Sequence, residues 1–288
     1  MLILFNVAIC KPLTRFFYGG AVFLSACVAA DAHEFWIEPE TSQIERGDKI
    51  IARLNVGQDL RGSSYSYLPQ RFDRFTYTVG DTTAPVEGRL GDNPALDMAT
   101  SDNGLHIIAY QSNSEILTYT QASKFEEFLE YEGLDWVLDA HKNRGLPETQ
   151  FKEAYTRYAK SLVQVGPFDD AATQRDRPVG LPIELVAAQS PFKPDTTSID
   201  VLLLRDGKPL PNIQVATFQQ RSDGVFDRRL TRSNEKGKAE ISLQGNGFFL
   251  VSAVHMEETD PTEFDEDVVG RKPVWKSLWA SLTFRLDR

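Results

Sequence analysis

The feature that most constrains the fold is a succession of short strand-like segments separated by glycine and proline turns. Residues 49–57, 75–79 and 105–110 are rich in β-branched and aromatic residues, and turn residues follow the first two directly. Short strands at such spacing are typical of β-sandwiches. The pattern returns late in the chain, in residues 183–187, 199–204, 213–219, 239–243, 248–255 and 280–286. The sequence therefore predicts a mainly β protein.

A helical period interrupts this pattern in the middle of the chain. Ser123 and Glu126 have the spacing of a capping box, and the apolar residues that follow recur at helical intervals. Pro147 suits the first turn of a second helix, which we expect to run to about Val165. These two segments predict a helical hairpin inserted between two β regions.

The predicted organisation has five parts. Residues 1–32 form a signal peptide, 33–120 an N-terminal β region, 121–166 the helical hairpin, 167–182 a polar linker, and 183–288 a C-terminal β-sandwich. The expected fold class is thus mainly β with a helical insert (α+β), with two β-sandwich-like regions.

The first 32 residues have the order of a secretory signal. Lys11 and Arg15 precede an apolar run over residues 16–28, and Ala30-Asp31-Ala32 provides a cleavage site. The run is shorter than the about 20 residues that a transmembrane helix needs. Cleavage after Ala32 leaves a periplasmic protein that begins at His33. The alternative is a lipobox ending at Cys27, which leaves a lipid-anchored protein.

Cysteine and charge exclude several classes of function. Cys10 and Cys27 are the only cysteines, and both precede the predicted cleavage site. The mature chain therefore has no disulfides, thiolate ligands or thiol nucleophiles. The formal net charge is −10, and no basic cluster is present, which argues against a nucleic-acid partner. The acidic balance favours a cationic ligand.

Several segments together resemble a known bacterial family. They are residues 33–39 (HEFWIEP), 56–58, 125–135, 155–162, 181–186, 203–210, 253–256 and 275–284. This ordered set is similar to a NikM-like family of unknown-function domains, described as the periplasmic component of a cobalt/nickel transport system. The resemblance implies binding of nickel or cobalt. It also implies a separate membrane transporter as partner, since no transmembrane helix follows the signal. Residues 181–284 resemble immunoglobulin-like or transthyretin-like sandwiches.

The histidines are the candidate metal ligands. After cleavage, the free amine and imidazole of His33 can chelate one metal, and a second imidazole would complete a histidine brace suited to copper or nickel. His255 is the preferred second imidazole, because it ends an apolar strand beside an acidic loop over residues 257–267. His106, in another strand, is the next choice. The alternative is that these histidines are ordinary structural residues and the loop a solvated one.

Enzyme motifs are absent from the sequence. No nucleophile elbow, phosphate-binding loop or H-E-x-x-H zinc motif occurs, so we expect a protein that is not an enzyme. The preferred function is transition-metal binding for uptake or delivery. The first alternative is a non-catalytic envelope interaction protein with a β-sandwich binding face. The second is an oxidase that uses a copper brace on a polysaccharide.

Overall fold

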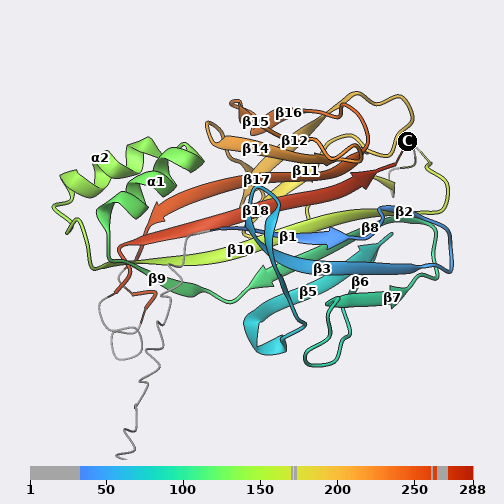
Figure 1. Cartoon of the computed structure of the whole chain (residues 1–288), viewed down its shortest axis with the longest axis horizontal. Helices are drawn as coiled ribbons and strands as arrows, with labels where there is room; N and C mark the ends of the chain where they lie inside the picture. Colours follow the sequence, from blue (N-terminus) through green and yellow to red (C-terminus); the bar gives the residue numbers. More distant parts are fainter. Residues whose placement is uncertain (1–32, 170, 172–173, 261, 265–271, 288) are drawn as a thin grey trace, which may run out of the picture. The chain divides into compact units, whose positions relative to one another are not determined.

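The fold is built on a ten-stranded sheet that both β regions share. The computed structural model describes residues 33–169, 171, 174–260, 262–264 and 272–287, and the predicted signal lies outside them. The main strand order is β15-β14-β17-β18-β10-β8-β5-β6, and β2 and β9 also pair with β10 (Figure 1). Its strands are β2 (Gln43–Ile44), β5 (Phe72–Val79), β6 (Thr82–Pro85), β8 (Gly104–Ser112), β9 (Glu115–Tyr119), β10 (Phe151–Val165), β14 (Gln214–Arg221), β15 (Phe226–Arg232), β17 (Gly247–Glu258) and β18 (Trp275–Leu286).

Two smaller sheets cover the opposite faces of this central sheet. One contains β1 (Glu34–Pro39), β3 (Lys49–Gln58), β4 (Arg61–Tyr65) and β7 (Leu96–Ala99). The other contains β11 (Ile183–Ala187), β12 (Ser198–Arg205), β13 (Lys208–Pro209) and β16 (Lys238–Ser242). A 3-10 turn, η1 (Pro69–Arg71), precedes β5.

Alternation along β10 explains the two cores. Leu162 packs with residues of β11 and β12, whereas Val163 packs with residues of β1 and β3. Successive side chains of a strand point to opposite faces, so one strand supplies both cores. The expected mainly β fold, with sandwich-like packing in both regions and a short helical part, is confirmed.

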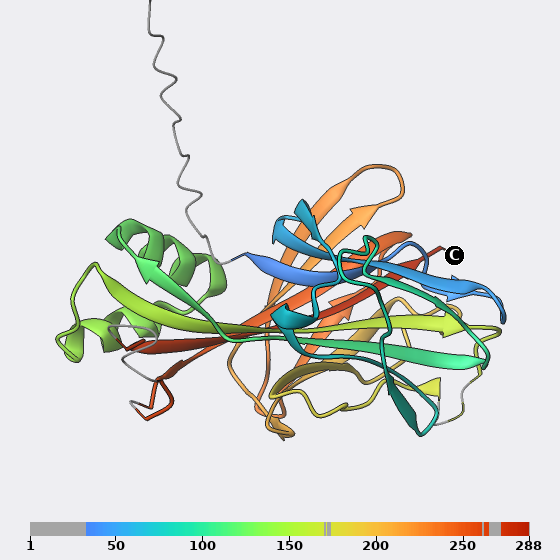
Figure 2. The same ribbon diagram turned by 90° about the horizontal axis from the view of Figure 1, so that it is seen from below.

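The helical part is shorter than predicted. Helices α1 (Ala122–Glu132) and α2 (Asp135–Asn143) lie at one end of the central sheet (Figure 2). Gly133, with φ of 66°, ends α1 in a left-handed conformation, and an added Cβ would lie 2.7 Å from the Gln214 side-chain oxygen. The predicted capping box is not used, because α1 begins after Gln121 without a side-chain cap.

The predicted second helix, from Pro147 to about Val165, is wrong. The chain there forms strand β10, which pairs in parallel with β18 and antiparallel with β8 and β9. Both faces of β10 are almost wholly buried, so the strand lacks the alternation of apolar and polar residues that marks a half-exposed strand. Tertiary pairing therefore overrides a local sequence that is compatible with a helix.

A buried ion network fixes the segment that we predicted to be a linker. Lys160 Nζ on β10 lies 2.8 Å from Asp176 Oδ1 and 2.9 Å from Glu184 Oε1, and all three side chains are buried. Lys160 also donates to the backbone oxygen of Arg177 at 3.1 Å. Glu184 accepts hydrogen bonds from three successive backbone amides, at residues 179, 180 and 181. The described part of the segment is thereby tied to the central sheet.

Candidate functional site

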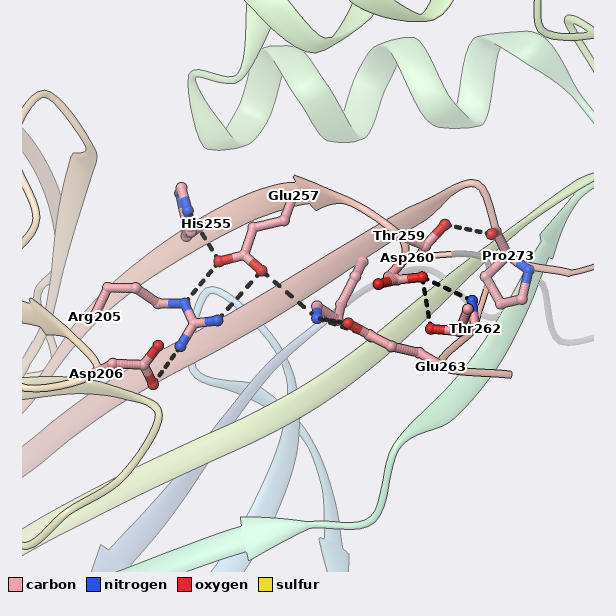
Figure 3. Close-up of polar contacts among 10 residues, drawn as sticks. Arg205, Asp206, His255, Glu257, Thr259, Asp260, Thr262, Glu263 and Pro273 are labelled. Carbon is pink, nitrogen blue, oxygen red and sulfur yellow. Dashed lines mark hydrogen bonds and ion pairs between the residues drawn. The ribbon is translucent and has the colours of Figure 1, made fainter. Parts of the chain in front are cut away.

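His255 lies on β17 and faces the sheet that contains β11 and β12. Odd-numbered residues of β17, such as Val251 and Ala253, pack into that core. The imidazole Nε2 of His255 lies 3.4 Å from Glu257 Oε1 (Figure 3). Its Nδ1 is buried and has no hydrogen-bond partner among the described residues.

Glu257 is held by two cations and by His255. Arg205 of β12 donates from Nε and from its second terminal nitrogen to the two Glu257 oxygens, at 2.7 and 3.3 Å (Figure 3). Lys276 Nζ lies 3.6 Å away. The hydrogen bond from His255, followed by that from Arg205, holds the pKa of Glu257 well below its ordinary range. This carboxylate is therefore satisfied by an ion-pair network.

The described acidic residues after Glu257 are also engaged. Asp260 accepts from the Thr262 amide at 2.8 Å and from its hydroxyl at 2.7 Å, Glu263 pairs with Lys276 at 3.0 Å, and Glu258 lies 3.5 Å from Arg144. Figure 3 shows Asp260, Thr262 and Glu263 on the side of Glu257 away from His255. Residues 265–267, the most acidic part of the predicted loop, lie outside the described residues.

His106 lies in a separate polar cavity. It is buried on β8, with Nδ1 3.3 Å from the Gly104 carbonyl oxygen, and burial lowers its pKa. The cavity has a volume of about 390 Å³, and its wall includes Asp81, Asp102 and Thr100. Donation from Nδ1 to a carbonyl would leave Nε2 as an acceptor.

His33 is half-buried directly before β1, which covers the other face of the central sheet. Trp36 of β1 packs against Phe248 and Leu250, the even-numbered residues of β17. His33 therefore lies on the face opposite to His255, and the structure does not bring the two together. His106 pairs with Val163 on β10. Val163 lies about 20 Å along that strand from Arg157, the β10 residue that contacts Phe35 near the start of β1. Within the described ranges, no three His, Cys, Asp or Glu side chains lie close enough to bind a metal.

The structure assembles a carboxyl cluster that consists of Glu34, Asp59, Tyr131, Glu132 and Arg228, and Glu34 follows His33 in the sequence. The Tyr131 hydroxyl lies 3.1 Å from Asp59 Oδ1 and 3.4 Å from Glu34 Oε1. The Arg228 guanidinium stacks on the Tyr131 ring, with its carbon 4.0 Å from the ring centroid. Glu34 and Glu132 are 3% and 5% exposed, so both carboxyl groups are buried.

The carboxyl cluster holds more acidic than basic groups in a buried place. Burial raises the pKa of Glu34 to about 7, and the nearby Asp59 adds to the rise. Burial, followed by the charge of Glu34, raises the pKa of Glu132 to about 8. Arg228 is the cation that opposes both shifts. A further cation near this cluster would favour the ionised carboxylates.

The model of a family described as a domain of unknown function (DUF4198) matches residues 30–257. The chain belongs to the DUF4198 family. No curated protein gives a significant match to this DUF4198 chain. Among solved structures, it is similar to a tetra-tandem repeat in the extending region of a large adhesion protein, at 11% identity and a TM-score of 0.21. That match covers 89% of this chain and 50% of the other, so the chain spans about half of that structure's length.

A second solved structure, the D0-D1 domain of Intimin, matches at 11% identity and a TM-score of 0.20, covering 86% of this chain and 96% of the other. At these TM-scores, neither similarity indicates a shared fold or function. Among the described residues of this DUF4198 protein, no helix is both long and apolar enough to cross a membrane.

Sequence reasoning missed the carboxyl cluster of this DUF4198 protein, although one signal was present. Phe125, Phe128, Leu129 and Glu132 have the i, i+3, i+4, i+7 spacing of one helix face, so Glu132 stands in an apolar stripe. An acidic residue in such a stripe indicates a buried carboxyl. The meeting of α1 with β1 and β15 depends on tertiary packing and has no such signal.

Proposed function

We propose that the protein is a periplasmic binding protein that chelates one divalent transition metal, nickel, cobalt or copper, at its mature N-terminus. The α-amine and imidazole of His33 form the chelate, and the carboxyl cluster next to it supplies a negative field. Its role is metal uptake or delivery, with a separate membrane transporter as the receiving partner.

The observation that carries the proposal is the buried carboxyl cluster that includes Glu34, the residue after His33. Glu34 follows His33 directly in the sequence. The negative charges of Glu34 and Glu132 repel each other, and Arg228 is the one described cation that lowers the pKa values of both carboxyl groups. Such a cluster favours a nearby positive charge. Among the described residues, no three His, Cys, Asp or Glu side chains form a metal site, and the proposal adds the free amine of His33 as a donor.

The proposed site excludes His255 and His106. His255 faces the opposite side of the central sheet and is engaged with Glu257. His106 lies in its own cavity, far along β10. The amine must lose its proton to bind a metal, and its ordinary pKa is about 8. We therefore expect the metal affinity to rise from pH 6 to pH 8.5.

The test is titration calorimetry of the mature protein, beginning at His33, with Ni²⁺ and Cu²⁺ in turn. We expect one site. An added glycine before His33 should weaken binding at least about 10-fold, because the amine then leaves the chelate. Glu132→Gln should weaken binding about 3-fold through loss of the negative field. The matched control, His255→Ala, should leave binding unchanged.

Two results would contradict the proposal. One is an affinity that the added glycine does not alter. The other is an exported protein whose intact mass corresponds to an acylated Cys27 start, because His33 would then have no free amine.

The second candidate function is an envelope interaction module, and the edge strand β15 favours it. β15 ends the ten-stranded order, and the exposed fractions of Val225, Phe226 and Leu230 are 47%, 36% and 53%. Apolar side chains on an open edge suit pairing with a strand of another protein. A Phe226→Asp/Leu230→Asp variant should lose crosslinking to an envelope partner while its metal titration stays unchanged, which separates the two functions.

A further inference from the structure

Arg157 is a buried cation without a polar partner. It is the one arginine among the described residues whose side chain is buried, at 7% exposure. Its guanidinium carbon lies 4.8 Å from the Tyr155 ring centroid and 5.9 Å from the Phe35 ring centroid. Nε is buried without a hydrogen-bond partner, and no described residue forms an ion pair with this guanidinium.

Two other arginines also lie over aromatic rings and have a buried Nε without a partner, but a terminal nitrogen of each has an acceptor. Arg228 lies over the Tyr131 ring and donates to the Tyr131 backbone oxygen at 3.1 Å. Arg285 lies over the Phe248 ring and pairs with Glu38 at 3.5 Å. Each of them combines an aromatic contact with an acceptor, whereas Arg157 has the aromatic contacts alone. A buried guanidinium without an acceptor is unfavourable, so it requires an explanation.

Glu115, which acts on Tyr110 and Tyr155 together with Arg157, is already engaged. Glu115 accepts a hydrogen bond from the Tyr155 hydroxyl and lies 3.8 Å from Arg71. The remaining surroundings are aromatic: the Phe35 ring stacks on Tyr110 at 4.8 Å, and Tyr65 lies beside it at 6.2 Å. Tyr65 and Tyr155 are only half-buried, which leaves the rim of this group open to solvent.

We propose that Arg157 binds the carboxylate of a small organic acid that carries an apolar or aromatic flank. A guanidinium fork matches a carboxylate in bidentate geometry, and one carboxylate charge neutralises one arginine. The half-buried rings of Tyr65 and Tyr155 at the rim suit the apolar flank of the ligand. The negative charge of Glu115 disfavours a doubly charged phosphate. This inference does not rest on the proposed metal site.

The test uses benzoate as the probe, with acetate and inorganic phosphate as comparisons, in calorimetric titration of the mature protein. We expect benzoate to bind more tightly than acetate or phosphate. Arg157→Met should weaken benzoate binding at least about 10-fold, and Arg157→Lys should weaken it about 5-fold because the fork is lost. Arg285→Met, the matched control with an aromatic contact and an existing partner, should leave it unchanged.

Thermal unfolding without ligand gives a second measurement. Because Arg157 lacks a partner, Arg157→Met should keep or raise the melting temperature, whereas Arg285→Met should lower it. The proposal is overturned if wild-type protein does not bind benzoate, if phosphate binds more tightly, or if Arg157→Met binds benzoate as well as wild type. It is also overturned if Arg157→Met melts as early as Arg285→Met, since Arg157 would then be a structural residue. Ni²⁺ titration of Arg157→Met should match wild type, so the two proposals fail separately.

Discussion

Replacing Lys160 with methionine should lower the free energy of unfolding by about 3–5 kcal/mol. Lys160 is fully buried and contacts Asp176 and Glu184, whose side chains are also buried. Methionine keeps most of the volume but removes the charge, which leaves two buried carboxyl groups without their cation. Burial already raises the pKa of Asp176, and Lys160 is the first group that opposes the rise. Urea unfolding at pH 7, followed by tryptophan fluorescence, measures the loss.

Lys238 provides the control for this prediction. It pairs with Asp200 at 3.2 Å on a neighbouring sheet, but both side chains are partly exposed. Lys238→Met should therefore cost no more than about 1 kcal/mol. A loss for Lys160→Met that is no larger than the loss for Lys238→Met would mean that the buried network does not fix the segment after β10.

The protein should become less stable as the pH rises from 5 to 9, and Glu132→Gln should reduce this dependence. Burial raises the pKa of Glu132 to about 8, whereas an unfolded chain leaves it at its ordinary value. Between these two values the folded state binds more protons, so the free energy of unfolding falls with rising pH. Each such group contributes up to about 1.4 kcal/mol per pH unit in this window. Glu34 and Glu153, both with pKa values raised by burial to about 7, act in the same direction.

Glutamine mimics the protonated carboxyl, so Glu132→Gln should match wild type near pH 5 and exceed its stability by roughly 2–5 kcal/mol at pH 9. Chemical unfolding of both proteins at pH 5, 7 and 9 makes the comparison. Glu130→Gln, an exposed position on the same helix, should follow the wild-type curve. Parallel wild-type and Glu132→Gln curves would show that Glu132 ionises in the folded protein as it does in solution.

The sequence predicted most strands because their composition and turns are local signals. The segments at 49–57, 75–79 and 105–110 correspond to β3, β5 and β8. β10 escaped prediction because both of its faces are buried, which removes the period of two, and its partner β18 is more than 100 residues away. Local composition in FKEAYTRYAKSL therefore favoured a helix that the sheet does not permit.

The candidate site was harder to predict than the fold. His255 and the acids after it are close in sequence, yet the residues that engage those acids are distant from them. Arg205 and Lys276 come from other strands, and Arg144 directly follows helix α2. Strand alternation puts His255 on one face of the central sheet. β1 crosses the opposite face, and His33 directly precedes β1. The sequence gives no signal for the site at Arg157, because the lack of an acceptor near its guanidinium follows from tertiary packing.

The position of β18 has a consequence for the order of folding. Residues 275–286 lie between β17 and β10 in the middle of the largest sheet. A growing chain therefore has β10 more than 100 residues before it has β18, the strand that joins β10 to β17. The two halves of the sheet cannot close until nearly all of the described chain is available. For a chain that carries a secretory signal, as proposed, this delay would keep the polypeptide unfolded during passage across a membrane. A variant that lacks residues 275–288 and is fused to a fluorescent protein should accordingly remain sensitive to protease along its whole length.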